Sequence, residues 1–175
     1  MMEFVRTILT GQFEAPLCML DQCLRACPLE HWDGKVANGT FRWVAYHTLF
    51  WVDVYLSPGD EEEFVLRDFH RDGGDEREDR VCPGLGKEET LAYVGICRQK
   101  MLDTLAAETA ESLQGPSGFR YRLMSRGELH IYSLRHVQHH TGQLSAYLRR
   151  VDPSLSAGDL PWVGRGWRKA EESKG

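Results

Sequence analysis

Residues 135–144, RHVQHHTGQL, place three histidines within five positions of a segment whose apolar residues recur at helical spacing. With 3.6 residues per turn, His136 and His140 lie about 40° apart on one face, one turn from each other, whereas His139 points about 60° to the other side. The apolar arc of this segment begins on the His140 side. The pattern therefore predicts that His136 and His140 point into the protein and that His139 points more toward solvent.

Long helices are predicted along most of the chain, because apolar residues recur every three or four positions. They cover residues 2–26, about 40–57, about 88–113 and 125–150. Pro16 either kinks the first helix or begins a second segment there. Ser125 and Glu128 have the spacing of a capping box at the start of the last helix. No strand-like alternation is present, so the predicted fold class is all-α, an up-down four-helix bundle.

The remaining segments differ from these helices in composition. Residues 58–87 are acidic and glycine-rich, which predicts a long solvated loop between the second and third helices, with one helical turn around residues 62–68. We expect one bundle domain over residues 1–152. The tail, residues 153–175, contains two tryptophans and is expected to pack back on the bundle.

Composition and motifs exclude several classes of protein. The net charge of −5 argues against nucleic-acid binding, and no apolar run is long enough for a membrane span. The N-terminus lacks the features of a signal peptide. The cysteines form no CxxC pair and are odd in number, so we expect no disulfide framework and a cytoplasmic location; they are Cys18, Cys23, Cys27, Cys82 and Cys97. No histidine follows a glutamate by three residues, as a di-iron carboxylate site requires.

His47 is the candidate for a third ligand beside His136 and His140. It lies near the middle of the second predicted helix, at the centre of an apolar arc. Taken alone, a buried histidine is more often a hydrogen-bonded core residue, and a histidine pair can be the polar edge of a helix. In a bundle of similar helices, however, the middles meet. The three imidazoles together therefore favour a metal site over either alternative.

The stretches HVQHHTGQL (136–144) and WVAYHTLFWVD (43–53) resemble the signature of the DinB/YfiT-like superfamily of metal-binding four-helix bundles. The resemblance covers the order and length of the four predicted helices. It implies that His47, His136 and His140 are metal ligands and that Gly142 and Gln143 complete the motif. It also implies zinc or nickel as the metal and a homodimer. The family includes thiol-dependent S-transferases and a mycothiol-dependent isomerase. The acidic loop departs from the family pattern and leaves the substrate open.

The function expected from these residues is binding of a divalent metal at three histidines with an open position. Such a site could serve a metal-dependent thiol S-transferase or a hydrolase acting on a small molecule, with a low-molecular-weight thiol as cosubstrate. The alternative is a non-catalytic protein that binds a metal or a small ligand. Gln143 and Tyr132 lie within about 40° of His136 and could orient a ligand or hydrogen-bond an imidazole. A helix-packing hydrogen bond is an equal alternative for Gln143.

Overall fold

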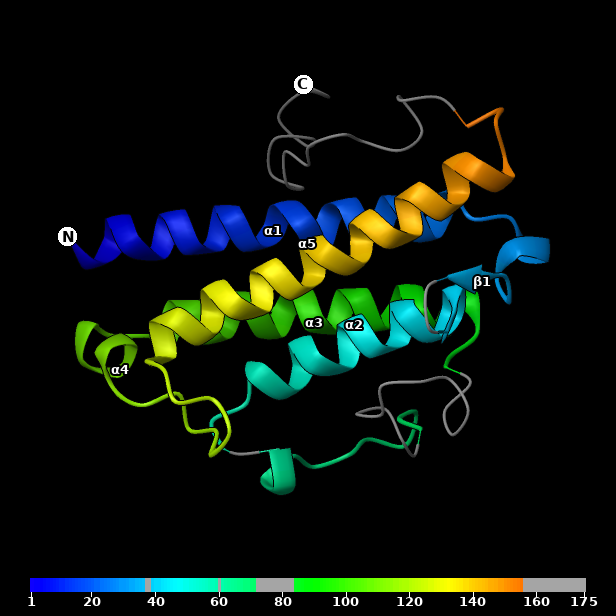
Figure 1. Cartoon of the computed structure of the whole chain (residues 1–175). Coiled ribbons are helices and arrows are strands. Elements are labelled where there is room, and N and C mark those ends of the chain that lie inside the picture. The colour runs from blue at the N-terminus through cyan, green and yellow to red at the C-terminus, as the bar shows by residue number, and fades with distance from the viewer. Residues whose placement is uncertain (37–38, 60, 72–83, 156–175) are drawn as a thin grey trace.

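The computed structural model describes residues 1–36, 39–59, 61–71 and 84–155, and these are mostly helical (Figure 1). The α-helices are α1 (Met2–Ala26), α2 (Phe41–Tyr55), α3 (Lys87–Ala107), α4 (Ala110–Gln114) and α5 (Arg126–Val151). Two short 3₁₀ turns cover Leu29–His31 and Glu61–Glu63, and the two-residue strands β1 (Lys35–Val36) and β2 (Gly39–Thr40) pair antiparallel. The all-α prediction is therefore confirmed. Among the described residues, no helix is long and apolar enough to cross a membrane.

The helix boundaries follow the local sequence signals. α1 runs through Pro16 without interruption and buries the predicted apolar stripe, so no second segment begins at the proline. α2 begins where the Thr40 side chain accepts a hydrogen bond from the Trp43 backbone N–H. The predicted capping box starts α5: the Ser125 N–H donates to Glu128 at 2.8 Å, and the Glu128 N–H donates to the Ser125 hydroxyl at 3.2 Å. Each cap satisfies backbone donors that have no partner within the helix.

The directions of the helices differ from the predicted up-down order. α2 and α3 run parallel, because contacts advance together along both helices: Leu49 with Cys97, Asp53 with Lys100, and Leu56 with Thr104. α1 is antiparallel to α3, and α2 is antiparallel to α5. α1 and α5 therefore run one way and α2 and α3 the other (Figure 1). The physical reason is the long separation between the end of α2 at Tyr55 and the start of α3 at Lys87. It allows α3 to begin at the same end of the bundle as α2, whereas a short hairpin loop would make the two helices antiparallel.

The predicted third helix is also interrupted, at Glu108. α3 ends at Ala107, Glu108 has extended backbone angles, and α4 restarts behind the cap of Thr109. The Glu108 carboxylate turns inward, where it accepts hydrogen bonds from Arg126 Nε at 3.1 Å and His130 Nε2 at 2.8 Å. A buried carboxylate needs such partners, and the break in the helix allows Glu108 to reach them.

The acidic connection is only partly a solvated loop. His70 is buried, and its Nδ1 accepts a hydrogen bond from the Arg67 backbone N–H at 2.7 Å. Its Nε2 lies 2.8 Å from the hydroxyl of Tyr93 on α3, and that hydroxyl donates to Asp53 on α2. The predicted turn around residues 62–68 is a single 3₁₀ turn at Glu61–Glu63. Aromatic contacts hold residues 64–71 against the helices: the Phe64 ring packs on Phe50 of α2, and the Phe69 ring packs on Tyr93 of α3. The prediction of a solvated loop rested on charge and glycine content and did not take these aromatic residues into account.

Two predictions concern residues outside the described part of the chain. Residues 72–83 contain half of the acidic residues of the stretch 58–87, together with Cys82. Residues 156–175 contain the tryptophans of the tail. The packing of the tail and the domain division at residue 152 stay predictions; α5 itself ends at Val151.

Candidate metal centre

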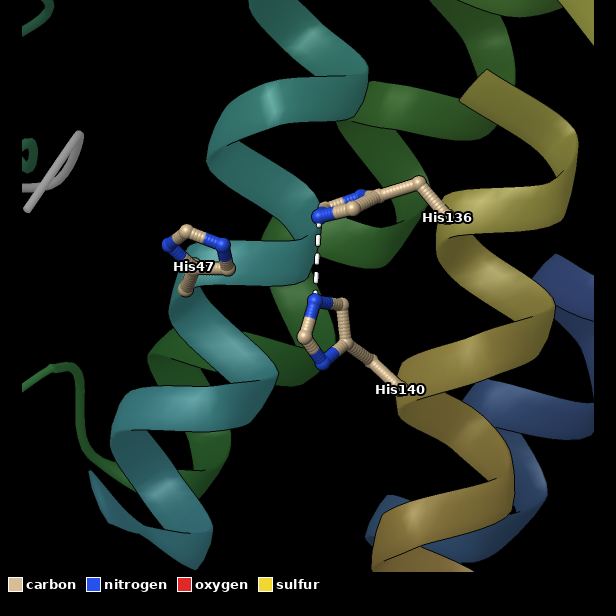
Figure 2. Close-up of side chains that lie close together, drawn as sticks. All are labelled: His47, His136 and His140. Atoms are coloured by element: carbon tan, nitrogen blue, oxygen red, sulfur yellow. Dashed lines mark hydrogen bonds between the residues drawn. The ribbon is translucent and has the colours of Figure 1, made fainter. Parts of the chain in front are cut away.

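Three histidines from two helices converge at the middle of the helix pair α2 and α5 (Figure 2). His47 lies on α2 and faces His136 and His140, which lie one turn apart on α5. The ring centres are 5.4 Å apart for His47 and His136, 5.3 Å for His47 and His140, and 4.5 Å for His136 and His140. One nitrogen of each ring lies within 4.8 Å of the others, so this cluster could hold a metal ion. The prediction that these three positions meet is confirmed.

Gln143 determines which nitrogen of His140 is available for a metal. The side-chain oxygen of Gln143 lies 2.8 Å from Nδ1 of His140, and because an amide oxygen only accepts, Nδ1 must carry the proton. In the neutral ring, Nε2 then has a free lone pair. This Nε2 lies 3.0 Å from Nε2 of His136. With the proton of His140 on Nδ1, Nε2 of His136 donates this hydrogen bond, and a metal ion that bound both nitrogens would take its place.

The protonation of the rings suits metal ligation. Burial, together with the nearby His140 and His47, lowers the pKa of His136 to about 2. Burial also lowers the pKa of His140, although the hydrogen bond with Gln143 partly opposes that shift. Both rings are therefore neutral near pH 7, as metal ligands must be. Nδ1 of His136 is buried and has no hydrogen-bond partner among the described residues. His139 is exposed, as predicted.

Comparison with known proteins places this arrangement in a family. A family model described as the DinB superfamily matches residues 12–144, most of the chain. The chain belongs to the DinB superfamily. The matched residues include His47, His136 and His140, as well as Gln143. No curated protein and no solved structure gives a significant match.

In this DinB protein, two aromatic side chains of α2 contact the imidazole of His47 on the same helix. Trp43 stacks on His47 with ring centres 4.9 Å apart, and Trp51 meets the other side edge-on at 6.4 Å. Trp43 is buried, whereas Trp51 is half-buried. The two indoles thus contact the His47 ring from the preceding and the following turn of α2.

The sequence pattern singled out Tyr132 as a residue near the DinB histidines, but it did not indicate Arg122. Tyr132 forms no hydrogen bond to an imidazole among the described residues; its ring instead meets Tyr55 at 5.6 Å. Arg122 lies over the ring of Tyr132 and close enough to His136 to help lower its pKa. Sequence reasoning missed Arg122, because it lies in an irregular segment before α5 where no periodicity indicates direction.

Proposed function

We propose that His47, His136 and His140 bind one divalent metal ion, with zinc or nickel as the leading candidates, and leave a position open for a small ligand. The observation that carries this proposal is the convergence of three imidazoles, of which His136 and His140 are neutral near pH 7 and His140 is oriented by Gln143. Imidazole ligands suit zinc, nickel and iron alike, and a site with three protein ligands is typical of catalytic metals. Membership of the DinB superfamily supports the same assignment.

We further propose that the protein is a metal-dependent thiol S-transferase or hydrolase acting on a small molecule. When bound, a divalent ion held by neutral ligands retains its full charge and lowers the pKa of a thiol or water beside it. The chain contributes by keeping His136 and His140 neutral, by orienting His140 through Gln143, and by packing Trp43 and Trp51 against His47. A homodimer and a cytoplasmic location stay predictions.

Metal content tests the ligand assignment. The substitution His140→Ala removes one of three ligands, and we expect purified protein to lose its bound metal, measured as ions per chain by elemental analysis. His139→Ala is the matched control, because His139 lies next in sequence but is exposed. We expect that variant to retain about one ion per chain. Equal metal content in both variants would show that the assignment is wrong.

Thiol consumption tests the reaction class. Metal-loaded protein is incubated with a panel of low-molecular-weight thiols and generic electrophiles, beside His47→Ala as the control. We expect wild type to consume a thiol or hydrolyse a substrate, and the control to lose this activity while keeping its helical circular-dichroism signal. If a metal-loaded wild type gives no turnover above the control, the non-catalytic metal- or ligand-binding function replaces this proposal.

A further inference from the structure

A pocket separate from the candidate metal centre lies where α2 ends and the connection to α3 begins. Its volume is about 310 Å³, and none of the three histidines lines it. This volume is at the small end of the range for ligand sites, so the pocket suits a small molecule. The charged and apolar side chains that line it come from the connection and from α3: Glu63, Phe64, Val65, Arg67 and Lys100.

Lys100 forms part of the wall, but its donors are already used by the fold. Its ammonium donates to the Asp53 carboxylate at 2.5 Å, to the Asp53 backbone oxygen at 2.6 Å and to the Ser57 hydroxyl at 2.7 Å. These bonds engage all the protons of the ammonium. Lys100 also balances the charge of the Asp53 carboxylate, which is fully buried. Lys100 therefore shapes the pocket and leaves ligand binding to other groups.

Arg67 brings a positive charge and open hydrogen-bond donors to the pocket. Its backbone is fixed, because its N–H donates to Nδ1 of the buried His70 at 2.7 Å. Its Nη2 lies 3.7 Å from the Asp53 carboxylate, too far for a hydrogen bond, and Lys100 already balances that carboxylate. Within the described part of the chain its guanidinium donates no hydrogen bond, and its side chain is 41% exposed. The planar fork of donors is thus available to a ligand.

Glu63 brings a negative charge to the same pocket. Its carboxylate lies against Gly59, where a Cβ would overlap it, so the glycine leaves room for this side chain. Glu63 is exposed, and it forms no ion pair with Arg67, Lys100 or any other residue that the structure describes. The pocket therefore contains a cation and an anion that line one space without neutralising each other.

These features together indicate the chemistry of a ligand. The fork of Arg67 matches the two oxygens of a carboxylate, and the Glu63 carboxylate matches an ammonium group. Phe64 and Val65 add apolar surface beside them, and Val65 is 81% exposed. A simple anion would face the charge of Glu63, and a simple cation would face that of Arg67. A small zwitterion with an apolar group satisfies all of these side chains at once.

We propose that this pocket binds a free amino acid with an apolar side chain, with its carboxylate on Arg67 and its ammonium group on Glu63. Phe64 and Val65 contact the apolar side chain of the ligand. The site is additional to the proposed metal function and does not depend on it. It involves binding only, and no bond is formed or broken.

A titration with three related compounds tests both charge contacts. L-leucine carries both charged groups, 4-methylpentanoate lacks the ammonium, and 3-methylbutylamine lacks the carboxylate. Shift changes of backbone amides in an NMR titration of the full chain give the dissociation constant of each compound. We expect L-leucine to bind about tenfold more tightly than either analogue, because each analogue loses one charge-assisted contact. The changes should centre on residues 61–71 and persist in His140→Ala, which separates this pocket from the metal centre.

Two substitutions remove the charge contacts one at a time. In Arg67→Gln, the preference for L-leucine over 3-methylbutylamine should fall to about twofold or less, whereas the preference over 4-methylpentanoate remains. Glu63→Gln should give the reverse pattern. Arg67→Lys should keep an intermediate preference, since it retains the charge without the fork.

Asp68→Asn is the matched control, because Asp68 is exposed next to Arg67 but does not line the pocket. It should keep both wild-type preferences. The inference is overturned if L-leucine causes no saturable shifts in wild type, or if both preferences are unchanged in folded Arg67→Gln and Glu63→Gln. Loss of L-leucine binding in His140→Ala would also overturn it, because the ligand would then belong to the metal centre.

Discussion

Gln143 controls the availability of a ligand nitrogen on His140 without itself being a proposed ligand. Its side-chain oxygen fixes the proton on Nδ1 and leaves Nε2 for the metal. We expect Gln143→Leu to weaken metal affinity about 10- to 100-fold, the usual effect of losing a partner that orients a ligand. Competition against a metal-sensitive indicator measures this. Gln138→Leu, on the exposed side of the same helix, should leave the affinity unchanged. An equal loss in both variants would argue against an orienting role.

The lowered pKa values of His136 and His140 predict how metal binding depends on pH. Protons compete with the metal only near and below the pKa of a ligand, and both values lie below the ordinary value of about 6.5. The apparent affinity should therefore remain nearly constant from pH 8 to about 6.5 and fall only under more acidic conditions. Equilibrium dialysis at a series of pH values measures it. A steep loss of affinity that is already complete at pH 6.5 would contradict neutral, buried ligands.

Asp53 on α2 links that helix to α3 and to residues 61–71. Its carboxylate is buried, lies 2.5 Å from the Lys100 ammonium and accepts a hydrogen bond from Tyr93 at 3.1 Å. In Asp53→Asn the Lys100 ammonium loses its counter-charge in a largely buried place. We expect a loss of about 3 kcal/mol in the free energy of unfolding, measured with urea. The exposed Asp103 on α3 provides the control, since Asp103→Asn should cost less than about 0.5 kcal/mol.

The same carboxylate makes the stability depend on pH in the acidic range. Burial alone would raise the pKa of Asp53, but the neighbouring His70 and Lys100 lower it to about 2. A lowered pKa stabilises the fold above the ordinary value of 3.8, and that contribution is lost as the pH falls toward 2. The contribution is about 2 kcal/mol. Asp53→Asn should therefore lose less stability than wild type between pH 5 and pH 2. Parallel curves for the two proteins would contradict this contribution.

The whole molecule should stay folded without its metal. The core draws buried apolar side chains from all four long helices, and it does not depend on the three histidines. A metal that binds only the folded state adds stability, about 2.7 kcal/mol when its free concentration is a hundred times Kd. For a chain of this length, chelation should then lower Tm by about 5–10 °C. The helical circular-dichroism signal at room temperature should remain. Its loss on chelation would show that folding requires the metal.

The sequence by itself determined the features that depend on near neighbours. Helix periodicity placed His136 and His140 on one face and His139 away from it, and the Ser125 capping box marked the start of α5, because three or four residues suffice to set these relations. The motif around the histidines also predicted the family. The convergence with His47 needed the added assumption that helix middles meet, and the structure confirmed it.

Only the tertiary structure decided the features that depend on distant partners. The parallel course of α2 and α3 follows from a long connection whose path no local pattern describes. The break at Glu108 follows from Arg126 and His130, which reach it from another helix. Likewise Arg122, from the irregular segment before α5, lies over the rings of two tyrosines from different helices, Tyr55 on α2 and Tyr132 on α5. Such contacts form between residues far apart in the chain, so spacing along the sequence carries no signal of them.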